Sequence, residues 1–292
     1  MKYFEKHPMT MIVIGVIGIS MSAILIRYST APSAVTASWR LLWTVILMSP
    51  VTLGNRTIRQ ELFSINRKTL AMSLLSGVFL AIHFWFWFES LRYTSVASAS
   101  TIVSTEVIWV SIGFFLFLKG RLSLKAIAAI GVAFAGSAFV AFADSGSGGT
   151  HLQGDLYALL AAMAVAVYML IGRIIRAGVS NGVYTYLVYI ACAAGLLTTS
   201  VVQQQGLFDY GINGILVGLA LAVFSTILGH SVFSWCLKYF SPSFVSASKL
   251  CEPVVAAILA GFLFGEVPGV LQLIGCVLIL GSVLYYSRLE DK

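Results

Sequence analysis

Apolar residues occur along this chain in long blocks separated by short connections. They do not form the periodic stripe expected of a helix on the surface of a soluble protein. A block of about 20 apolar residues is long enough to cross a hydrocarbon layer roughly 30 Å thick as a helix. The pattern predicts ten transmembrane helices, at residues 9–28, 32–53, 70–90, 95–118, 124–143, 154–175, 183–205, 214–236, 243–264 and 268–287.

The composition supports this interpretation. The 292 residues are 59% hydrophobic and only 10% charged, whereas about a quarter of a soluble domain is charged. The connections leave no room for a soluble domain, and the first apolar block has full span length without a small-residue cleavage site. We therefore expect an all-α integral membrane protein with a single membrane domain and no cleavable signal peptide.

The net charge of +7 is a topology signal rather than evidence for a nucleic-acid partner. With the N-terminus placed in the cytoplasm, 14 of the 18 Lys and Arg residues fall on the cytoplasmic side, two fall outside and two lie within helices. Positive charge is concentrated in cytoplasmic connections of membrane proteins. The count predicts an inner-membrane protein with both termini in the cytoplasm and the lipid bilayer as its partner.

The second half of the chain repeats the first at a constant shift of 146 residues. Six identities relate the segment that starts at Leu91 to the one that starts at Leu237, and one of them pairs Glu106 with Glu252. Each half holds five predicted helices, an odd number, so the second half enters the membrane from the opposite side. Such inverted repeats alternate access around a site near the bilayer midplane in many secondary transporters. The predicted repeats are residues 1–146 and 147–292.

Three segments carry a family resemblance: ESLRYTSVASAS at 89–100, GHSVFSWCLKY at 229–239 and LCEPVVAAILAGFLFGE at 250–266. On these segments the chain resembles the EamA-type branch of the drug/metabolite transporter superfamily over essentially its whole length. The resemblance implies ten helices, a central cavity lined by both halves, and export or exchange of small metabolites such as amino acids. Relatives often carry a proline where this chain has Glu106-Val107, which predicts a more acidic cavity.

Ionisable residues inside a membrane span usually face a cavity or a partner, because a charge in lipid is costly. Lys249 and Glu252 are three residues apart on one predicted helix, so we expect them to pair. Pro253 lacks an amide hydrogen and leaves the carbonyl of Lys249 without its usual helical partner. The predicted intramembrane ionisable residues are Arg40, His83, Glu106, His230, Lys249 and Glu252.

Two alternatives stay open for several of these residues. Arg40 either extends to the outer surface or supplies a cation for a substrate carboxylate or for Glu106. Glu106 has no cation within four residues on its own helix, which makes it the candidate proton carrier, unless Arg40 or a histidine reaches it. His83 and His230 are either proton relays or hydrogen-bonded packing residues.

Aromatic side chains accompany the charges. Trp39, Trp43 and Trp109 lie nearer the charged residues than the other tryptophans and form either a cation–π wall for a substrate or ordinary packing. The substrate-binding residues predicted from these arguments are Arg40, Trp39, Trp43, Trp109, Lys249 and Glu252.

The leading interpretation is a secondary active transporter of a small polar metabolite, above all an amino acid or a related zwitterion, with protons as the candidate coupling ion. An exporter of cationic or aromatic drugs and amines is the alternative. An integral membrane enzyme is remote, because no nucleotide-binding loop, metal-ligand spacing or nucleophile–base motif occurs. We expect no catalytic residues, no metal, no cofactor, no nucleic acid, and a monomer or weak dimer.

Overall fold

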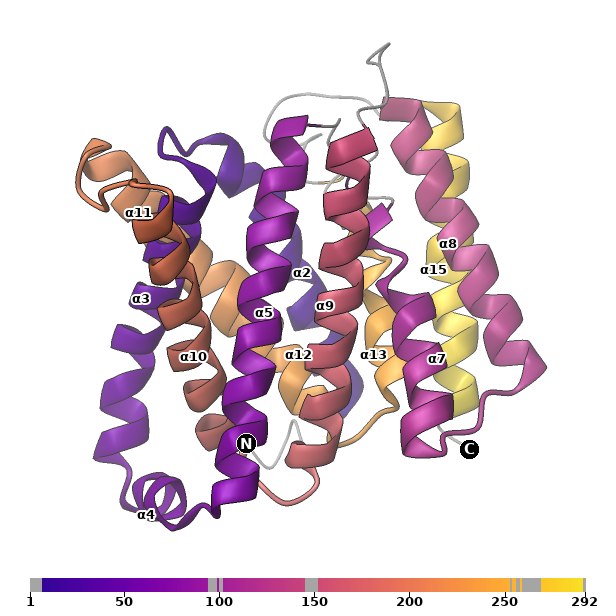
Figure 1. The fold of residues 1–292 in the computed structure, drawn as a ribbon. Helices are drawn as coiled ribbons and strands as arrows, with labels where there is room; N and C mark the ends of the chain where they lie inside the picture. Colours follow the sequence, from indigo (N-terminus) through magenta and orange to yellow (C-terminus); the bar gives the residue numbers. More distant parts are fainter. Residues whose placement is uncertain are drawn as a thin grey trace.

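The protein is described by a computed structural model that covers residues 7–93, 99, 102–144, 152–252, 254, 255, 258 and 269–290. Within these ranges the chain is helical and no strand occurs. The helices stand side by side as a bundle (Figure 1). Their bounds are α2 Pro8–Arg27, α3 Ser33–Gly54, α4 Arg56–Ser64, α5 Arg67–Tyr93, α7 Glu106–Leu118, α8 Leu124–Asp144, α9 Leu152–Arg176, α10 Asn181–Val202, α11 Gly211–Leu221, η1 Ala222–His230, α12 Ser231–Cys236, α13 Pro242–Lys249 and α15 Val270–Glu290.

Among the described residues, six helices are long and apolar enough to cross a membrane. They are Pro8–Ile26, Ser33–Gly54, Arg67–Tyr93, Leu152–Arg176, Asn181–Val202 and Gly211–Cys236. They coincide with the expected helices 1, 2, 3, 6, 7 and 8, so the chain is a multi-pass membrane protein. Helices α8 and α15 occupy the fifth and tenth expected segments. The fourth and ninth segments extend into residues outside the described ranges, and the count of ten stays a prediction.

Helix packing brings distant parts of the chain together. Helix α5 packs along α9 and α10, α10 also packs along α3, and α2 packs along η1. Helix α7 contacts α9 and α13. Helices α8 and α15 pack along each other at one flank of the bundle (Figure 1).

A short helix, α4, occupies the connection between α3 and α5, where the apolar pattern predicts no element. Asn55 starts it, because the Asn55 side-chain oxygen accepts hydrogen bonds from the backbone N–H groups of Thr57 and Ile58. The Glu61 carboxylate accepts a 2.7 Å hydrogen bond from the backbone N–H of Ser180, next to the start of α10. Helix α4 lies at one end of the bundle (Figure 1). The Glu61–Ser180 hydrogen bond connects it to α10, a helix of the other half of the chain.

Two of the predicted spans, 95–118 and 243–264, contain a turn. A turn at Ser104–Thr105 precedes Glu106, the first residue of α7, and a turn at Leu250–Cys251 precedes Glu252. The two turns are separated by the same 146 residues as the sequence repeat. Pro253 already indicates an irregularity in the second of these spans, whereas nothing in the sequence predicts the turn before Glu106 in the first.

The two interruptions have different chemical causes. Pro253 has no N–H to donate to the carbonyl of Lys249, and the backbone tightens so that Leu250 donates to Ala247 at 3.0 Å. The first half has no proline here. Instead the hydroxyl of Thr105 donates to the carbonyl of Ile102 at 2.6 Å, alongside a 3.0 Å bond from the Thr105 N–H to the same oxygen.

The eighth expected helix contains a nine-residue π-helix, η1, between α11 and α12. A π-helical segment widens the helix and leaves backbone carbonyls with altered partners; here the Thr226 hydroxyl donates to the carbonyl of Leu221 at 3.3 Å. Helix α2 lies very close to it: a Cβ added at Gly18 would lie 2.7 Å from the carbonyl carbon of Leu228 and 2.8 Å from the carbonyl oxygen of Phe224. Gly18 is therefore required for this contact.

Replacing Gly18 by alanine should destabilise the protein by about 1–3 kcal/mol, because rigid backbone must move to accept the methyl group. Gly131→Ala is the matched control, since Gly131 is also inside a helix and a Cβ there meets no atom within 4 Å. The thermal midpoints of the two purified variants in detergent check this. Equal midpoints for both variants would contradict the close approach of α2 and η1.

Candidate functional site

A buried ion pair joins α7 and α13. The ammonium nitrogen of Lys249 lies 2.9 Å from Oε1 of Glu106, and their side chains are 9% and 8% exposed. The hydroxyl of Ser246, one turn before Lys249, donates to the same carboxylate oxygen at 3.0 Å. A carboxylate removed from water is stabilised when both a cation and a hydrogen-bond donor reach it. Glu106 has both.

This pairing corrects two expectations. Lys249 was expected to pair with Glu252 on its own helix, and Glu106, which has no cation nearby on its own helix, was expected to be reached by Arg40 or a histidine if by any cation. The turn at Leu250–Cys251 interrupts the helical face that Lys249 and Glu252 would share. The packing of α13 on α7 brings Lys249 to Glu106 instead. The cation that reaches Glu106 across the interior is neither Arg40 nor a histidine.

The remaining contacts of Lys249 come from two further helices. The sulfur of Met169 in α9 lies 3.5 Å from the ammonium nitrogen. The ring of Phe233 in α12 lies 5.7 Å from it, within the range of a cation–π contact. The ion pair thus lies where α7, α9, α12 and α13 meet.

Glu252 lies one turn beyond the ion pair and is partly buried. Its backbone carbonyl accepts a 3.4 Å hydrogen bond from the hydroxyl of Ser20 in α2. Its carboxylate has no ion-pair or hydrogen-bond partner among the described residues, although Glu106, Lys249 and Arg40 all interact with it electrostatically. Among the described residues, Glu252 is thus a partly buried carboxylate without a direct cation contact.

Arg40 is 1% exposed and does not reach the surface. Its Nε donates to the hydroxyl of Thr226 in η1 at 2.7 Å, and its guanidinium carbon lies 4.2 Å above the ring of Phe84 in α5. Its Nη2 is buried without a hydrogen-bond partner, and no described carboxylate lies within ion-pair distance. An arginine buried without an anion is costly, which makes this guanidinium a candidate anion-binding group.

The two histidines lie close together, with ring centroids 6.3 Å apart. Nδ1 of His83 contacts the carbonyl of Ala161 at 2.9 Å, so this nitrogen carries the hydrogen and donates it. The His230 ring packs against Phe84 and Tyr168, with centroid distances of 5.2 and 6.4 Å. These contacts describe well-packed rings, and a relay role for either histidine stays a prediction.

The three tryptophans differ in their surroundings. The indole N–H groups of Trp39 and Trp43 donate to backbone carbonyls of Leu207 and Ile215 at 3.0 and 3.1 Å, which fixes both rings against the second half of the chain. Nε1 of Trp109 is buried without a hydrogen-bond partner. Trp109 lies three residues after Glu106 on α7, so it is the tryptophan that offers a donor near the ion pair.

The structure therefore brings Glu106, Lys249, Glu252 and Arg40 into one electrostatic network. The indoles of Trp39 and Trp43 are held by the second half of the chain, and their role in substrate binding stays a prediction. Sequence reasoning did not select several residues that complete the site. Of these, Ser246 matches Ser100 at the 146-residue shift of the repeat, and no pattern singled out the rest. The additional residues are Ser20, Phe84, Met169, Thr226, Phe233 and Ser246.

A bundle of membrane-long helices with a charged interior is typical of membrane transporters. The chain belongs to the EamA-like transporter family, whose model matches residues 8–142 and again residues 152–288. This match confirms the resemblance to the EamA-type branch of the drug/metabolite transporter superfamily. Family membership indicates a transporter rather than an enzyme.

Two individual proteins are similar to the chain. The uncharacterized transporter YxxF of Bacillus subtilis (strain 168) is 23% identical over 291 residues, which is 98% of this chain and 90% of YxxF. A protein of known crystal structure superposes on the chain with a TM-score of 0.80 and 17% sequence identity. The alignment covers 97% of this chain and 96% of the chain in that crystal structure. The latter likeness shows a shared fold.

Replacing Glu106 by leucine should lower stability by about 3–5 kcal/mol, because Lys249 would keep a buried charge without an anion. The double variant Glu106→Leu/Lys249→Met should recover most of that loss, since neither charge remains. The thermal midpoints of Glu106→Leu, Lys249→Met and the double variant give the coupling free energy between the two side chains. Lys68→Gln is the control: Lys68 is exposed at the start of α5 and has no ion pair among the described residues, so its loss should change stability by under about 1 kcal/mol. Additive single-variant losses would contradict the pairing.

Proposed function

We propose that this chain is a secondary active transporter that exports or exchanges an amino acid or a related zwitterion by alternating access. The observation that carries the proposal is the pair of unmatched interior charges. Arg40 is a buried cation without an anion, and Glu252 is a carboxylate without a described cation. The two interact electrostatically. A zwitterion supplies the opposite charge to each of them.

In this proposal the cargo carboxylate binds at the Nη side of Arg40, because Nε already donates to Thr226. Arginine binds carboxylates through two parallel N–H groups, which gives orientation as well as affinity. The cargo ammonium binds Glu252. Lys249 is a weaker anion-binding group, since Glu106 neutralises it. The unpartnered indole N–H of Trp109 is a further donor to the cargo, while Trp39 and Trp43 support the wall from behind.

The proposed architecture has ten helices in two inverted repeats, residues 1–146 and 147–292, in the inner membrane with cytoplasmic termini. Three observations support it. The family model matches twice along the chain. The turns before Glu106 and Glu252 share the 146-residue shift. The helix contacts also follow this symmetry. If each helix is exchanged for its counterpart in the other half, the contact between α5 and α9 becomes the contact between η1 and α2. The α8–α15 and α3–α10 contacts each stay the same under this exchange.

The ion pair offers a means of coupling transport to protons. Protonation of Glu106 removes its charge and releases Lys249, which then competes with the cargo ammonium for Glu252, three residues along the chain. Proton binding and cargo binding thus oppose each other, as antiport requires. His83 and His230, close to Phe84 and Arg40, are candidates for the path by which the proton leaves.

Export of cationic or aromatic amines is the second candidate function, favoured by the unpaired carboxylate of Glu252. The two candidates differ in their use of Arg40. An amine without a carboxylate leaves that guanidinium without an anion, whereas a zwitterion does not.

Thermal shifts of the purified protein with amino acids, the matching amines and the matching carboxylic acids separate these candidates. At least one amino acid should stabilise the protein more than its amine or its acid. Arg40→Gln should weaken that binding by about tenfold or more, because a charged hydrogen-bond partner is lost. Arg92→Gln, an exposed arginine at the end of α5, is the control. Equal stabilisation by amine and amino acid, unchanged in Arg40→Gln, would favour the amine exporter.

Proteoliposome flux tests the coupling. In Glu106→Gln, Lys249 is released permanently, so an imposed pH gradient should no longer drive cargo accumulation. Exchange of internal for external cargo should continue with weaker affinity. The parent protein, measured in the same gradient, is the reference. Gradient-driven accumulation at the parent rate in Glu106→Gln would rule out this role for Glu106.

A further inference from the structure

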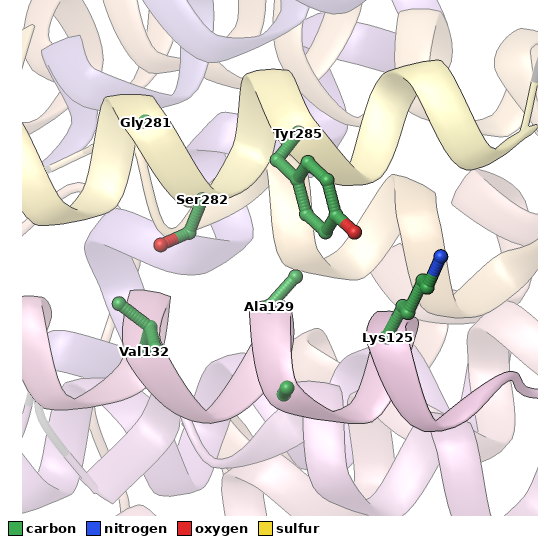
Figure 2. Close-up of a pocket in the computed structure, with 7 residues that line it drawn as sticks. Lys125, Ala129, Val132, Gly281, Ser282 and Tyr285 are labelled. Carbon is green, nitrogen blue, oxygen red and sulfur yellow. The ribbon is translucent and has the colours of Figure 1, made fainter.

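A groove separates α8 from α15 near one end of the two helices (Figure 2). Its volume is about 370 Å³. It shares no residue with the charged site described above, so the cargo proposal does not explain it. The lining residues are Lys125, Ala128, Ala129, Val132, Gly281, Ser282 and Tyr285.

The groove opens on the membrane-facing flank of the protein. Helices α8 and α15 form one side of the bundle (Figure 1), and large apolar side chains next to the groove are exposed, among them Ile127 at 51% and Leu284 at 64%. In a membrane protein such residues contact lipid rather than water. A molecule that enters the groove therefore comes from the bilayer.

The lining is apolar except at one end. Ala128, Ala129, Val132 and Gly281 provide small and aliphatic surfaces along the groove. The hydroxyl of Ser282 donates to the carbonyl of Leu278 in its own helix and needs no other partner.

Lys125, the second residue of α8, lies at one end of the row, and the ring of Tyr285 extends toward it (Figure 2). Lys125 has no ion-pair partner among the described residues. It falls on the side of the membrane that the positive-inside count places in the cytoplasm, close to Lys119 and Arg121. An ammonium at the end of an apolar groove suits a ligand with an anionic head and a hydrocarbon tail.

We propose that the groove binds one anionic phospholipid of the cytoplasmic leaflet. Its phosphate contacts Lys125 and the hydroxyl of Tyr285. One acyl chain runs toward Val132, about 10 Å along α8 for seven residues. The chain fills the space that the short side chains of Ala128 and Gly281 leave between the helices. The lipid thereby contributes packing between α8 and α15.

Glycine variants test whether the groove is occupied. A Cβ at Gly281 meets no atom within 4 Å, so Gly281→Val adds its methyl groups to the groove from an unobstructed position. Gly131→Val is the matched control, because Gly131 is equally unobstructed on α8 but does not line the groove. Native mass spectrometry of the detergent-solubilised protein, titrated with phosphatidylglycerol or phosphatidylcholine, measures the bound lipid. Gly281→Val should bind several-fold less phosphatidylglycerol than Gly131→Val.

A charge variant tests the headgroup contact. Lys125→Gln should reduce the preference for phosphatidylglycerol over phosphatidylcholine by about fivefold, the effect expected of one basic residue near an anionic lipid. Lys68→Gln, an exposed lysine at the start of α5, is the control and should keep the preference. Circular dichroism and size-exclusion elution establish that each variant is folded. If Gly281→Val fails to fold, the comparison of Lys125→Gln with Lys68→Gln tests the proposal alone. Equal lipid preference in Lys125→Gln and Lys68→Gln, or equal lipid occupancy in the two valine variants, would overturn the proposal.

Discussion

The ion pair between Lys249 and Glu106 is the interaction on which the interior of this protein depends. Charges in a poorly solvated interior attract each other strongly, and each is costly without the other. The pair lies where four helices meet and joins the first half of the chain to the second. Within the described part of the chain, it leaves Glu252 and Arg40 as the members of the network without an ion-pair partner.

The irregular backbone of the site has a physical requirement of its own. Within a bilayer, non-helical backbone is tolerated only where protein or a water-filled cavity surrounds it. The π-helix places Thr226 against the buried Arg40, and the two turns immediately precede Glu106 and Glu252, so this irregular backbone borders the charged interior. The same interruptions that disturb helical hydrogen bonding bring the functional side chains within reach of one another.

The sequence alone predicts the membrane class, the family and ten transmembrane helices, six of which the described residues confirm, because apolar block length and motif residues are local properties of the chain. It also selects Arg40, Lys249 and both glutamates, since a charge within an apolar block is conspicuous. It assigns the wrong partner to Lys249, because a three-residue spacing predicts contact only on an unbroken helix. Thr226 and Phe84, which hold Arg40, could not be found, since their role depends on how η1 and α5 pack around α3.

The two members of the ion pair occupy opposite ends of their helices. Glu106 is in the first turn of α7 and Lys249 is in the last turn of α13. Aligned peptide dipoles give a helix a partial positive charge at its start and a partial negative charge at its end, worth about 0.3–1 kcal/mol to a complementary side chain. Each charge therefore keeps a favourable backbone field when its partner leaves. Both ionised side chains are thus stabilised by their own helix ends whether or not the pair is formed, so neither depends on its partner for all of its stabilisation.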